Sequence, residues 1–344
     1  MSNIKQYFVT SHTAHGFVNY LASNISEVEV YLVSHPSLTF KTQIFQQLIN
    51  YFSENDEPIE VLISGHSKHY IEGVIVPSRS LAIVANHIMS NDRDVKQEFA
   101  FGRSIDVTEK HKAINETFQQ AYNYIAESLQ THMKIEDFYI QVMDFNRSNE
   151  LIAQVKEQFI TSNVRGDLRQ GKIYQRLFGS NTIHGNYNIV PELLPTVERR
   201  LYLQGGPGTG KSVFMKEIVK SCLANGYDVE QYMCSFDPSS IDMVIVPKLS
   251  FCILDSTGSH KFSPLSDQDV VIDLFKQSRT SDIEEQQKEA MTQIKDEQRT
   301  VRKKGNALMH QAGQQIEALE KMLMHHVTQA EIDRKVSAIL AILL

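Results

Sequence analysis

The chain has 344 residues, of which 42% are hydrophobic and 22% are charged, and its formal net charge at pH 7 is -7. These values indicate a folded globular protein long enough for two domains, and they exclude an intrinsically disordered chain. The acidic net charge argues against a nucleic-acid partner, and the apolar segment at residues 336–344 is too short to span a bilayer. Three cysteines without paired spacing indicate a reducing compartment, so we expect a cytoplasmic protein with no membrane partner.

The first half of the chain recurs in the second half at an offset of 169 or 170 residues. Residues 10–16 share four identities in seven with residues 179–185, and residues 71–77 share five in seven with residues 241–247. A repeat of this length predicts two similar domains. We place them at residues 1–170 and 171–344, because glycines interrupt the pattern between residues 165 and 178.

Three segments of the first half have counterparts in the second. Residues 35–42 hold Lys41 and Thr42 in a stretch without glycine, and the apolar run at residues 80–85 predicts a buried strand that ends in alanine. A stripe of residues at helical spacing then predicts a helical C-terminal extension, and its members are Ile114, Phe118, Ala121, Tyr122, Ile125 and Leu129. The first half is therefore expected to be an α/β unit with a helical tail.

The second half contains a phosphate-binding loop. Residues 205–212 have the spacing G-x-x-x-x-G-K-[ST], with an apolar strand before them and an amphipathic helix after them. Such a loop turns its backbone N–H groups toward a polyphosphate, so we expect nucleotide contacts from Gly205, Gly206, Pro207, Gly208, Thr209, Gly210, Lys211 and Ser212. Lys211 is expected to reach the β- and γ-phosphates as a catalytic group, and the Ser212 hydroxyl to bind Mg²⁺. ATP and Mg²⁺ are the expected ligands.

Three acidic residues after the loop are further candidates. Asp255 ends an apolar strand, as in a Walker B segment, and is expected to hold Mg²⁺ opposite Ser212; a turn-capping role is the alternative. Asp237 and Asp242 follow the predicted strand at residues 229–233, at the end of a sheet where ligands collect. Each is a candidate base, water-positioning acid or substrate contact, and Asp237 is alternatively the N-cap of a short helix beginning at Pro238.

Other features bear on the rate of hydrolysis. No glutamate directly follows Asp255, so we expect slow turnover rather than vigorous ATPase activity. Position alone makes Arg199, Arg200 and Arg279 candidates for an arginine finger, and a solvated surface role is the alternative for each. The segment at residues 255–260 is a candidate switch-like loop beside the γ-phosphate.

Comparison of the two halves predicts that the first has lost nucleotide binding. Leu38 and Phe40 align with Gly208 and Gly210, and Ala85 aligns with the candidate metal ligand. Bulky side chains at the glycine positions would strain the turn and fill the phosphate space. The first half is therefore expected to be a regulatory or structural pseudo-NTPase, with weak binding through Lys41 as the alternative.

A second helical tail is predicted from residues 283–327, where apolar residues recur at coiled-coil-like spacing. Gly305 is expected to weaken this helix midway. The tails are expected either to pack over their own or the sister sheet, or to form an arm for a protein partner. The tail also carries the only dense basic cluster of the sequence, which consists of Arg299, Arg302, Lys303 and Lys304.

With these motifs the chain resembles a little-characterised family of tandem P-loop ATPases from Firmicute bacteria. The similarity rests on residues 206–212, 237–245 and 253–257 and on a Ser-x-Thr-x-x-Gly pattern at the start of each half. Members of that family have two glycine-rich loops, so the loss of the first loop removes the expectation of ATP cycling at two sites. The resemblance implies ATP binding and a cytosolic setting, and it supplies no substrate.

Together these observations predict an α/β fold of two tandem P-loop NTPase-like domains, mainly parallel sheets flanked by helices, each with a helical C-terminal extension. The leading hypothesis is an Mg²⁺-dependent ATP-binding protein with slow hydrolysis in the second domain. A small-molecule or nucleotide kinase, with Asp237 or Asp242 as base, is the first alternative. A non-enzymatic scaffold with a vestigial loop is the second.

Overall fold

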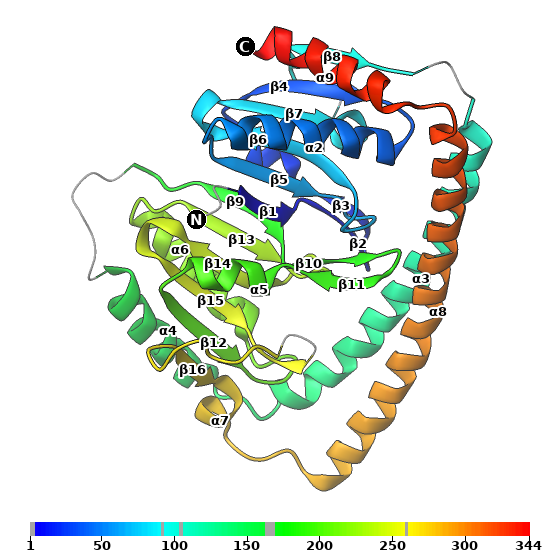
Figure 1. Ribbon diagram of the computed structural model, residues 1–344. Helices are drawn as coiled ribbons and strands as arrows, with labels where there is room; N and C mark the ends of the chain where they lie inside the picture. Colours follow the sequence, from blue (N-terminus) through cyan, green and yellow to red (C-terminus); the bar gives the residue numbers. More distant parts are fainter. Residues whose placement is uncertain (1–3, 91–92, 103–105, 162–168, 259–260) are drawn as a thin grey trace.

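The computed structural model describes residues 4–90, 93–102, 106–161, 169–258 and 261–344. In this part of the chain twelve strands form one continuous sheet, in the order β16-β12-β15-β14-β13-β9-β1-β5-β6-β7-β4-β8, with helices flanking it (Figure 1). The chain is therefore an α/β protein, as the sequence predicts. The boundary glycine at position 166 and the last two residues of the candidate switch-like loop, 259 and 260, lie outside the described residues.

The strand order is symmetrical about the centre of the sheet. One side holds the first-half strands β1 Ile4–Phe8, β4 Glu29–Ser34, β5 Ile59–Ile63, β6 Ile71–Val76, β7 Leu81–Ala85 and β8 Gln97–Ala100. The other holds β9 Ile173–Leu177, β12 Arg199–Gln204, β13 Val229–Met233, β14 Ile241–Val246, β15 Phe251–Asp255 and β16 Val270–Asp273. In each half five strands point the same way, and only β6 or β14 runs opposite.

The two halves meet at the centre of the sheet, where β1 pairs antiparallel with β9 through Phe8 and Leu177. Each half also has a small hairpin beside this junction, formed by β2 Thr10–Thr13 with β3 Gly16–Asn19 and by β10 Gly179–Thr182 with β11 Gly185–Asn188. The sheet thus passes from one half to the other without a break. The division into two P-loop domains stays a prediction.

Short-range sequence signals explain where the helices begin and end. The helices are α1 Leu21–Asn24, α2 Leu38–Glu54, α3 Thr108–Ile140, α4 Phe145–Phe159, α5 Val190–Leu193, α6 Lys211–Ala224, α7 Leu274–Ser278, α8 Glu285–Met324 and α9 Gln329–Leu343. Helix α2 begins after Ser37, whose hydroxyl oxygen accepts the Phe40 N–H. Helix α6 ends at Ala224 with Asn225 as its C-cap, and Gly226 follows with a φ of 74°.

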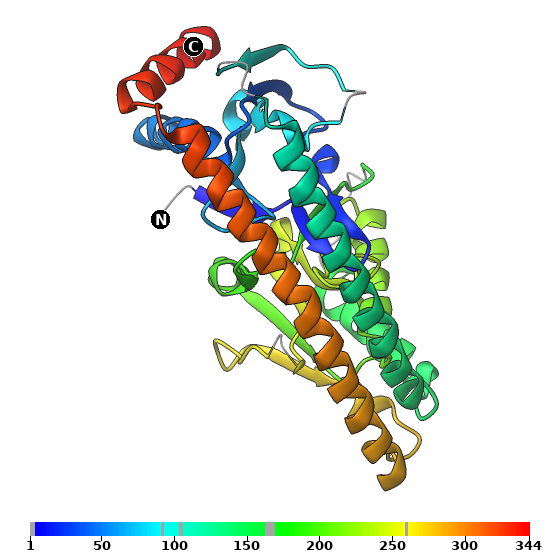
Figure 2. The same ribbon diagram turned by 90° about the vertical axis from the view of Figure 1, so that its right-hand side faces the viewer.

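The two longest helices, α3 and α8, pack against each other in antiparallel directions along one side of the molecule (Figure 2). Their buried seam contains Phe118, Ala121 and Ile125 from α3 and Ala312 and Ile316 from α8, together with further aliphatic side chains. The apolar stripes that the sequence predicts therefore cover each other. Among the described residues no helix, α8 included, is long and apolar enough to cross a membrane.

Gly305 does not interrupt α8, which runs through it as one helix, and the expected weakening of the helix at this point stays a prediction. A Cβ atom at this position would lie 3.1 Å from Ile125 Cγ1 and 3.4 Å from the Ala121 carbonyl oxygen. The glycine therefore lets α8 approach α3 closely, and this packing offsets its low helix propensity.

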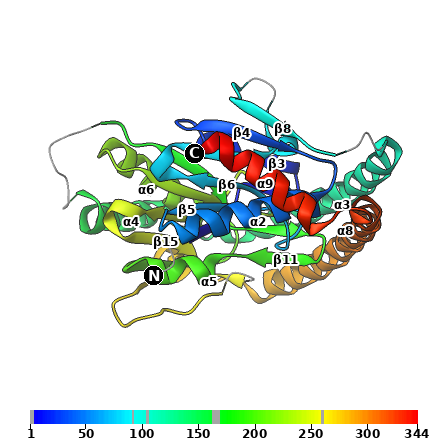
Figure 3. The same ribbon diagram turned by 45° about the horizontal axis from the view of Figure 1, so that its top comes forward.

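The final helix of each half covers the other half of the sheet. Helix α4 packs on α6, where Lys156 Nζ lies 3.0 Å from Glu217 Oε2 and the Phe159 ring stacks on Phe251 at 4.7 Å. Helix α9 packs on α2 (Figure 3). Between these helices Gln47 Nε2 donates a 2.8 Å hydrogen bond to Asp333 Oδ1. The stripes predicted as tails lie on α3 and α8 and pack on each other, whereas α4 and α9, the helices that follow them, are the ones that cover the sister half.

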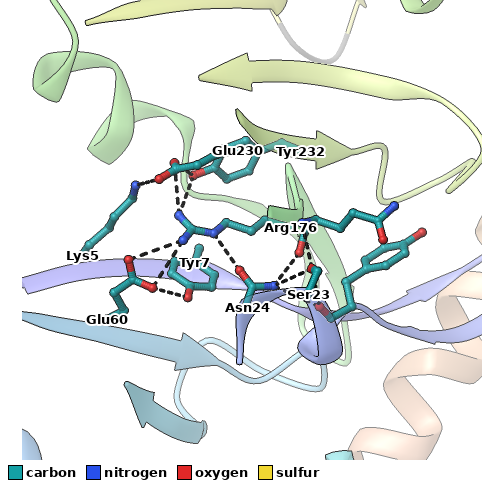
Figure 4. A network of polar contacts seen from close by, with 10 residues as sticks. Lys5, Tyr7, Ser23, Asn24, Glu60, Arg176, Glu230 and Tyr232 are labelled. Atoms are coloured by element: carbon teal, nitrogen blue, oxygen red, sulfur yellow. Dashed lines mark hydrogen bonds and ion pairs between the residues drawn. The ribbon is translucent and has the colours of Figure 1, made fainter. Parts of the chain in front are cut away.

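A buried arginine also joins the halves at the centre of the sheet (Figure 4). Arg176 on β9 lies 3.1 Å from Glu230 Oε2 and 3.3 Å from Glu60 Oε2, and its guanidinium stacks 3.6 Å from the ring centroid of Tyr7. Lys5 forms a second ion pair with Glu230. Burial alone would raise the pKa of Glu230, but Arg176 and Lys5 outweigh it and hold that pKa below its usual value. Charged partners from both halves therefore satisfy one another at this junction.

Candidate functional site

The glycine-rich loop connects β12 to α6 and has the backbone geometry that its glycines predict. Gly205, Gly208 and Gly210 have φ values of 143°, 77° and 92°, which L-residues with a Cβ rarely adopt. Gly210 is the N-cap of α6 and offers no side-chain acceptor to the first turn. The N–H groups that start a helix have no partner within the helix, and an uncapped first turn is an arrangement that suits an anion.

The lysine and the two predicted metal ligands lie around this turn. Lys211 Nζ donates hydrogen bonds to the carbonyl oxygens of Gly205 at 2.6 Å and Gly206 at 2.9 Å, and it lies 3.6 Å from Asp255 Oδ2. Ser212 Oγ accepts the Ile241 N–H at 3.0 Å, which fixes the hydroxyl at the start of β14. An ammonium, a hydroxyl and a carboxylate from three separate elements therefore converge at the start of α6.

A cleft of 1510 Å³ opens above the loop, between the second half of the sheet and the paired helices α3 and α8. It is lined by these residues predicted from the sequence: Gly205, Gly206, Pro207, Gly208, Gly210, Lys211, Ser212, Asp237, Asp242 and Asp255. Thr209 differs from them because its side chain is fully buried behind the loop, where its hydroxyl donates to the Gly206 carbonyl oxygen at 2.9 Å. Its role is therefore to brace the loop rather than to face a ligand.

Asp237 and Asp242, which lie in sequence between the glycine-rich loop and β15, have different surroundings. Asp237 Oδ1 accepts hydrogen bonds from the Ser239 N–H at 3.0 Å and the Ser239 hydroxyl at 2.7 Å, so it caps a turn. Residues 238 and 239 form that turn rather than a helix, and the short helix expected at Pro238 was wrong. Asp242 is 5% exposed and lies beside Cys234, whose pKa is raised well above its usual value by burial and by this carboxylate.

Two residues of α3, which sequence analysis did not connect to the loop, lie against its rim. A Cβ atom on Gly206 would lie 2.1 Å from Tyr139 Cζ, and one on Gly208 would lie 2.6 Å from the Glu136 carbonyl oxygen. Burial and the nearby Asp237 raise the pKa of Glu136, while Lys211 opposes the shift. The first half of the chain thus places a carboxyl group at the mouth of the loop in the second half.

The basic cluster of the sequence faces the same cleft from α8. Arg299, Arg302 and Lys303 line it, and Arg302 donates a 2.8 Å hydrogen bond to Asn181 Oδ1 while its guanidinium lies 4.4 Å from the Phe236 ring centroid. The density of this cluster was visible in the sequence, but its position opposite the loop was not. Positive charge on both sides of the cleft favours an anionic ligand.

The arginines proposed from position alone do not line the cleft in the described part of the chain. Arg199 and Arg200 lie at the start of β12, whereas the loop follows its end. Arg200 is buried and pairs with Asp269 Oδ1 at 2.9 Å, and Arg279 pairs with Asp282 near α7. None of the three therefore reaches the loop of its own chain, and an arginine-finger role for them stays a prediction.

The corresponding turn in the first half carries an internal carboxylate. Glu320 of α8 accepts hydrogen bonds from the Ser37 hydroxyl at 2.5 Å, the Leu38 N–H at 2.8 Å and the Thr39 N–H at 2.9 Å. The Phe40 N–H is taken by the Ser37 hydroxyl oxygen at 3.0 Å. The anion-binding position at the start of α2 is therefore filled by the chain itself.

Glu136 and Glu320 occupy matching positions in the two halves. Each stands nine residues before the first residue of the following helix, since α4 begins at residue 145 and α9 at residue 329. The matching hydroxyls behave alike as well, because Thr42 Oγ1 accepts the Ile71 N–H at 3.0 Å just as Ser212 accepts Ile241. The turns before α2 and α6 thus have the same surrounding contacts. They differ because the Glu320 carboxylate binds the first turn of α2, whereas α6 has no side-chain cap.

Comparison of the chain with profiles of protein families, with curated proteins and with solved structures finds no match in any of the three. The resemblance to tandem P-loop ATPases therefore depends on the residues themselves.

Proposed function

We propose that this protein binds ATP with Mg²⁺ at the loop of its second half and hydrolyses it slowly, while the first half acts as a regulatory or structural pseudo-NTPase. The observation that carries the proposal is the contrast between the two helix N-termini. Helix α6 starts at Gly210 without a side-chain cap, whereas the first turn of α2 is satisfied by Ser37 and Glu320. One turn is thus open to a phosphate, and the other already holds a carboxylate.

The residues around the open turn fit a magnesium nucleotide. Lys211 would exchange its bonds to loop carbonyl oxygens for phosphate oxygens, and Ser212 and Asp255 offer the oxygen ligands that Mg²⁺ prefers. Bound Mg²⁺ supplies charge neutralisation on the phosphates. Arg299 and Arg302 supply further positive charge from the opposite wall.

The arrangement of the long helices supports regulation of one half by the other. Tyr139 and Glu136 of α3 contact the glycine-rich loop at residues 205–212. Helix α3 also packs along α8, whose Glu320 binds the corresponding turn at the start of α2. A phosphate on the loop that pushes Glu136 aside would move α3. Because α3 packs along α8, that movement would be passed on to α8 and to the start of α2. We propose the α3–α8 seam as the element that couples nucleotide state to the first half.

The test is a calorimetric titration of ATP, GTP and ADP with Mg²⁺ against three proteins, with phosphate release followed in parallel. Wild type is expected to bind ATP at one site, and Lys211→Ala is expected to abolish binding and phosphate release. The matched control is Lys41→Ala, because Lys41 occupies the equivalent position in the first half and should leave binding unchanged. Equal losses in both variants would overturn the assignment, and no binding by wild type would favour the scaffold hypothesis.

The volume of the cleft favours a kinase as the second candidate. Ligand pockets usually enclose about 300–1,000 Å³, and this cleft measures 1510 Å³, which leaves room for a second substrate beside a nucleotide. Asp237 and Asp242 line it as acceptor-side carboxylates. Under this proposal, ATP consumption rises on addition of one acceptor metabolite and a phosphorylated product accumulates, whereas an ATPase releases inorganic phosphate without any acceptor.

A further inference from the structure

The first half has three metal-ligating side chains gathered at one point. They are His66, Glu72 and His87, each of which offers one ligand atom within 4.8 Å of the others. His87 Nε2 lies 3.5 Å from Glu72 Oε1. Two ligands of one tetrahedral ion, with bonds of about 2.1 Å, stand about 3.4 Å apart, so this pair already has nearly that separation.

The cluster lies at the place that corresponds to the cleft of the second half. The same backbone hydrogen bonds form on both sides at an offset of 170 residues, from Ser64 N–H to Tyr70 and from Cys234 N–H to Ser240. At that offset His66, Glu72 and His87 correspond to Phe236, Asp242 and Thr257. The first half therefore has two imidazoles where the second half has a phenyl ring and a hydroxyl.

Neighbouring side chains hold the candidate ligands in place. His66 Nδ1 lies 3.0 Å from His12 Nε2, and His12 Nδ1 lies 2.7 Å from the Tyr122 hydroxyl of α3. The buried Glu72 accepts hydrogen bonds from the Thr10 hydroxyl at 2.6 Å and the Ser64 hydroxyl at 2.7 Å. Metal-binding histidines usually bond through their second nitrogen in this way, and ligating carboxylates are usually hydrogen-bonded too.

We propose that His66, Glu72 and His87 bind one divalent transition-metal ion, with Zn²⁺ as the best fit. Two imidazole nitrogens and one carboxylate suit zinc, whereas Mg²⁺ and Ca²⁺ prefer oxygen ligands alone. The His87 side chain is 27% exposed, which gives an ion a path from solvent and leaves room for a water as fourth ligand. The site is independent of the proposed nucleotide site, because it uses no residue of the second half.

Lys41 opposes an ion at this site. Its ammonium lies 3.0 Å from His87 Nδ1, and it is 3% exposed. An ion on Nε2 requires the ring proton on Nδ1, where it would face the Lys41 ammonium, so Lys41 must turn away when the ion binds. Replacement by an uncharged side chain of similar length, Lys41→Met, is therefore expected to tighten metal binding about tenfold or more, and weaker binding would contradict this arrangement.

The experiment is calorimetric titration of the chelator-treated full-length protein with Zn²⁺, together with Co²⁺ absorption spectroscopy. Wild type is expected to bind one ion per chain and to show the intense visible bands of four-coordinate Co²⁺. His87→Ala is expected to weaken Zn²⁺ binding by more than about 100-fold, since loss of even an outer-shell partner costs 10–100-fold. His66→Phe, which places the second-half residue in the first half, is expected to do the same.

The matched control removes another pair of histidines, His325 and His326, which follow each other at the exposed end of α8. Their rings lie 4.4 Å apart, close enough to bind zinc weakly at the surface. His325→Ala/His326→Ala should leave affinity and spectrum unchanged. No stoichiometric binding by wild type would overturn the proposal, and would leave Lys41 as the cation that balances Glu72. Equal affinity in wild type and His87→Ala, or loss of binding in the control, would overturn it too. Circular dichroism of each variant checks that its fold is retained.

Discussion

Neutralising Glu320 should destabilise the protein far more than an ordinary change on the surface of α8. Glu320 is 7% exposed, and its carboxylate joins the C-terminal part of α8 to the first turn of α2. The variant Glu320→Gln keeps the size of the side chain. It also removes the negative charge and replaces one acceptor oxygen with an NH₂ group that can only donate.

The magnitude follows from the three hydrogen bonds that Glu320 accepts from Ser37, Leu38 and Thr39. A hydrogen bond to a charged group contributes about 1.5–3 kcal/mol, and a carboxylate at a helix N-terminus adds about 0.3–1 kcal/mol. Glutamine retains one acceptor oxygen, so one or two of the three bonds are lost. Relief of the buried charge offsets part of this loss, and we expect unfolding to become easier by about 3 kcal/mol.

Urea unfolding followed by circular dichroism measures this difference. The matched control is Glu317→Gln, which makes the same chemical change at an exposed position one turn earlier and should alter stability by less than about 0.5 kcal/mol. A difference of less than about 1 kcal/mol between the two variants would refute the reasoning. It would mean that water, rather than Glu320, satisfies the start of α2.

Three further changes test other contacts. Arg176→Met leaves the buried Glu230 without its guanidinium partner and should lower the free energy of unfolding, measured in urea, by about 3–5 kcal/mol. The double variant Arg176→Met/Glu230→Gln should recover more than about 1 kcal/mol of this loss. Gly206→Ala places a methyl group against Tyr139 and should cost about 1–3 kcal/mol by thermal unfolding, and additive losses on combination with Tyr139→Ala would contradict that contact. Burial and Lys41 lower the pKa of His35 from 6.5 to about 4, so protonation favours the unfolded chain and stability should fall as pH drops from 6.5 toward 4. His35→Asn should flatten this part of the pH–stability curve, and an unchanged slope would argue against a buried neutral His35.

The local parts of the fold could be predicted from the sequence. The strand expected at residues 229–233 is β13 with the same bounds, and the apolar run before Asp255 is β15. The glycine loop lies between a strand and a helix, and three of its glycines adopt backbone angles that need glycine. These features depend on residues within a few positions of one another, so periodicity and turn chemistry are sufficient to locate them.

The arrangement of the tails could not be predicted in the same way. An apolar stripe shows that a helix must be covered, but it does not show by what. The partners of α3 are on α8, nearly 200 residues away, and the loop contacts of Glu136 and Tyr139 cross from one half to the other. Gly305 shows the same limit, because helix propensity predicts a weak point where packing requires a small residue.

The sequence by itself determined the glycine-rich turn between β12 and α6, its lysine and hydroxyl, and the loss of glycine in the first half, because each is a contiguous pattern with a local physical cause. Only the tertiary structure placed Glu320 on the closed turn, the basic cluster of α8 opposite the open one, and His66, Glu72 and His87 at one point. Glu320 and the basic cluster reach these places because α8 packs along α3 and against α2, and the three candidate metal ligands meet because β5, β6 and β7 are neighbours in the sheet. Such long-range packing depends on the whole chain and leaves no signal at any single position.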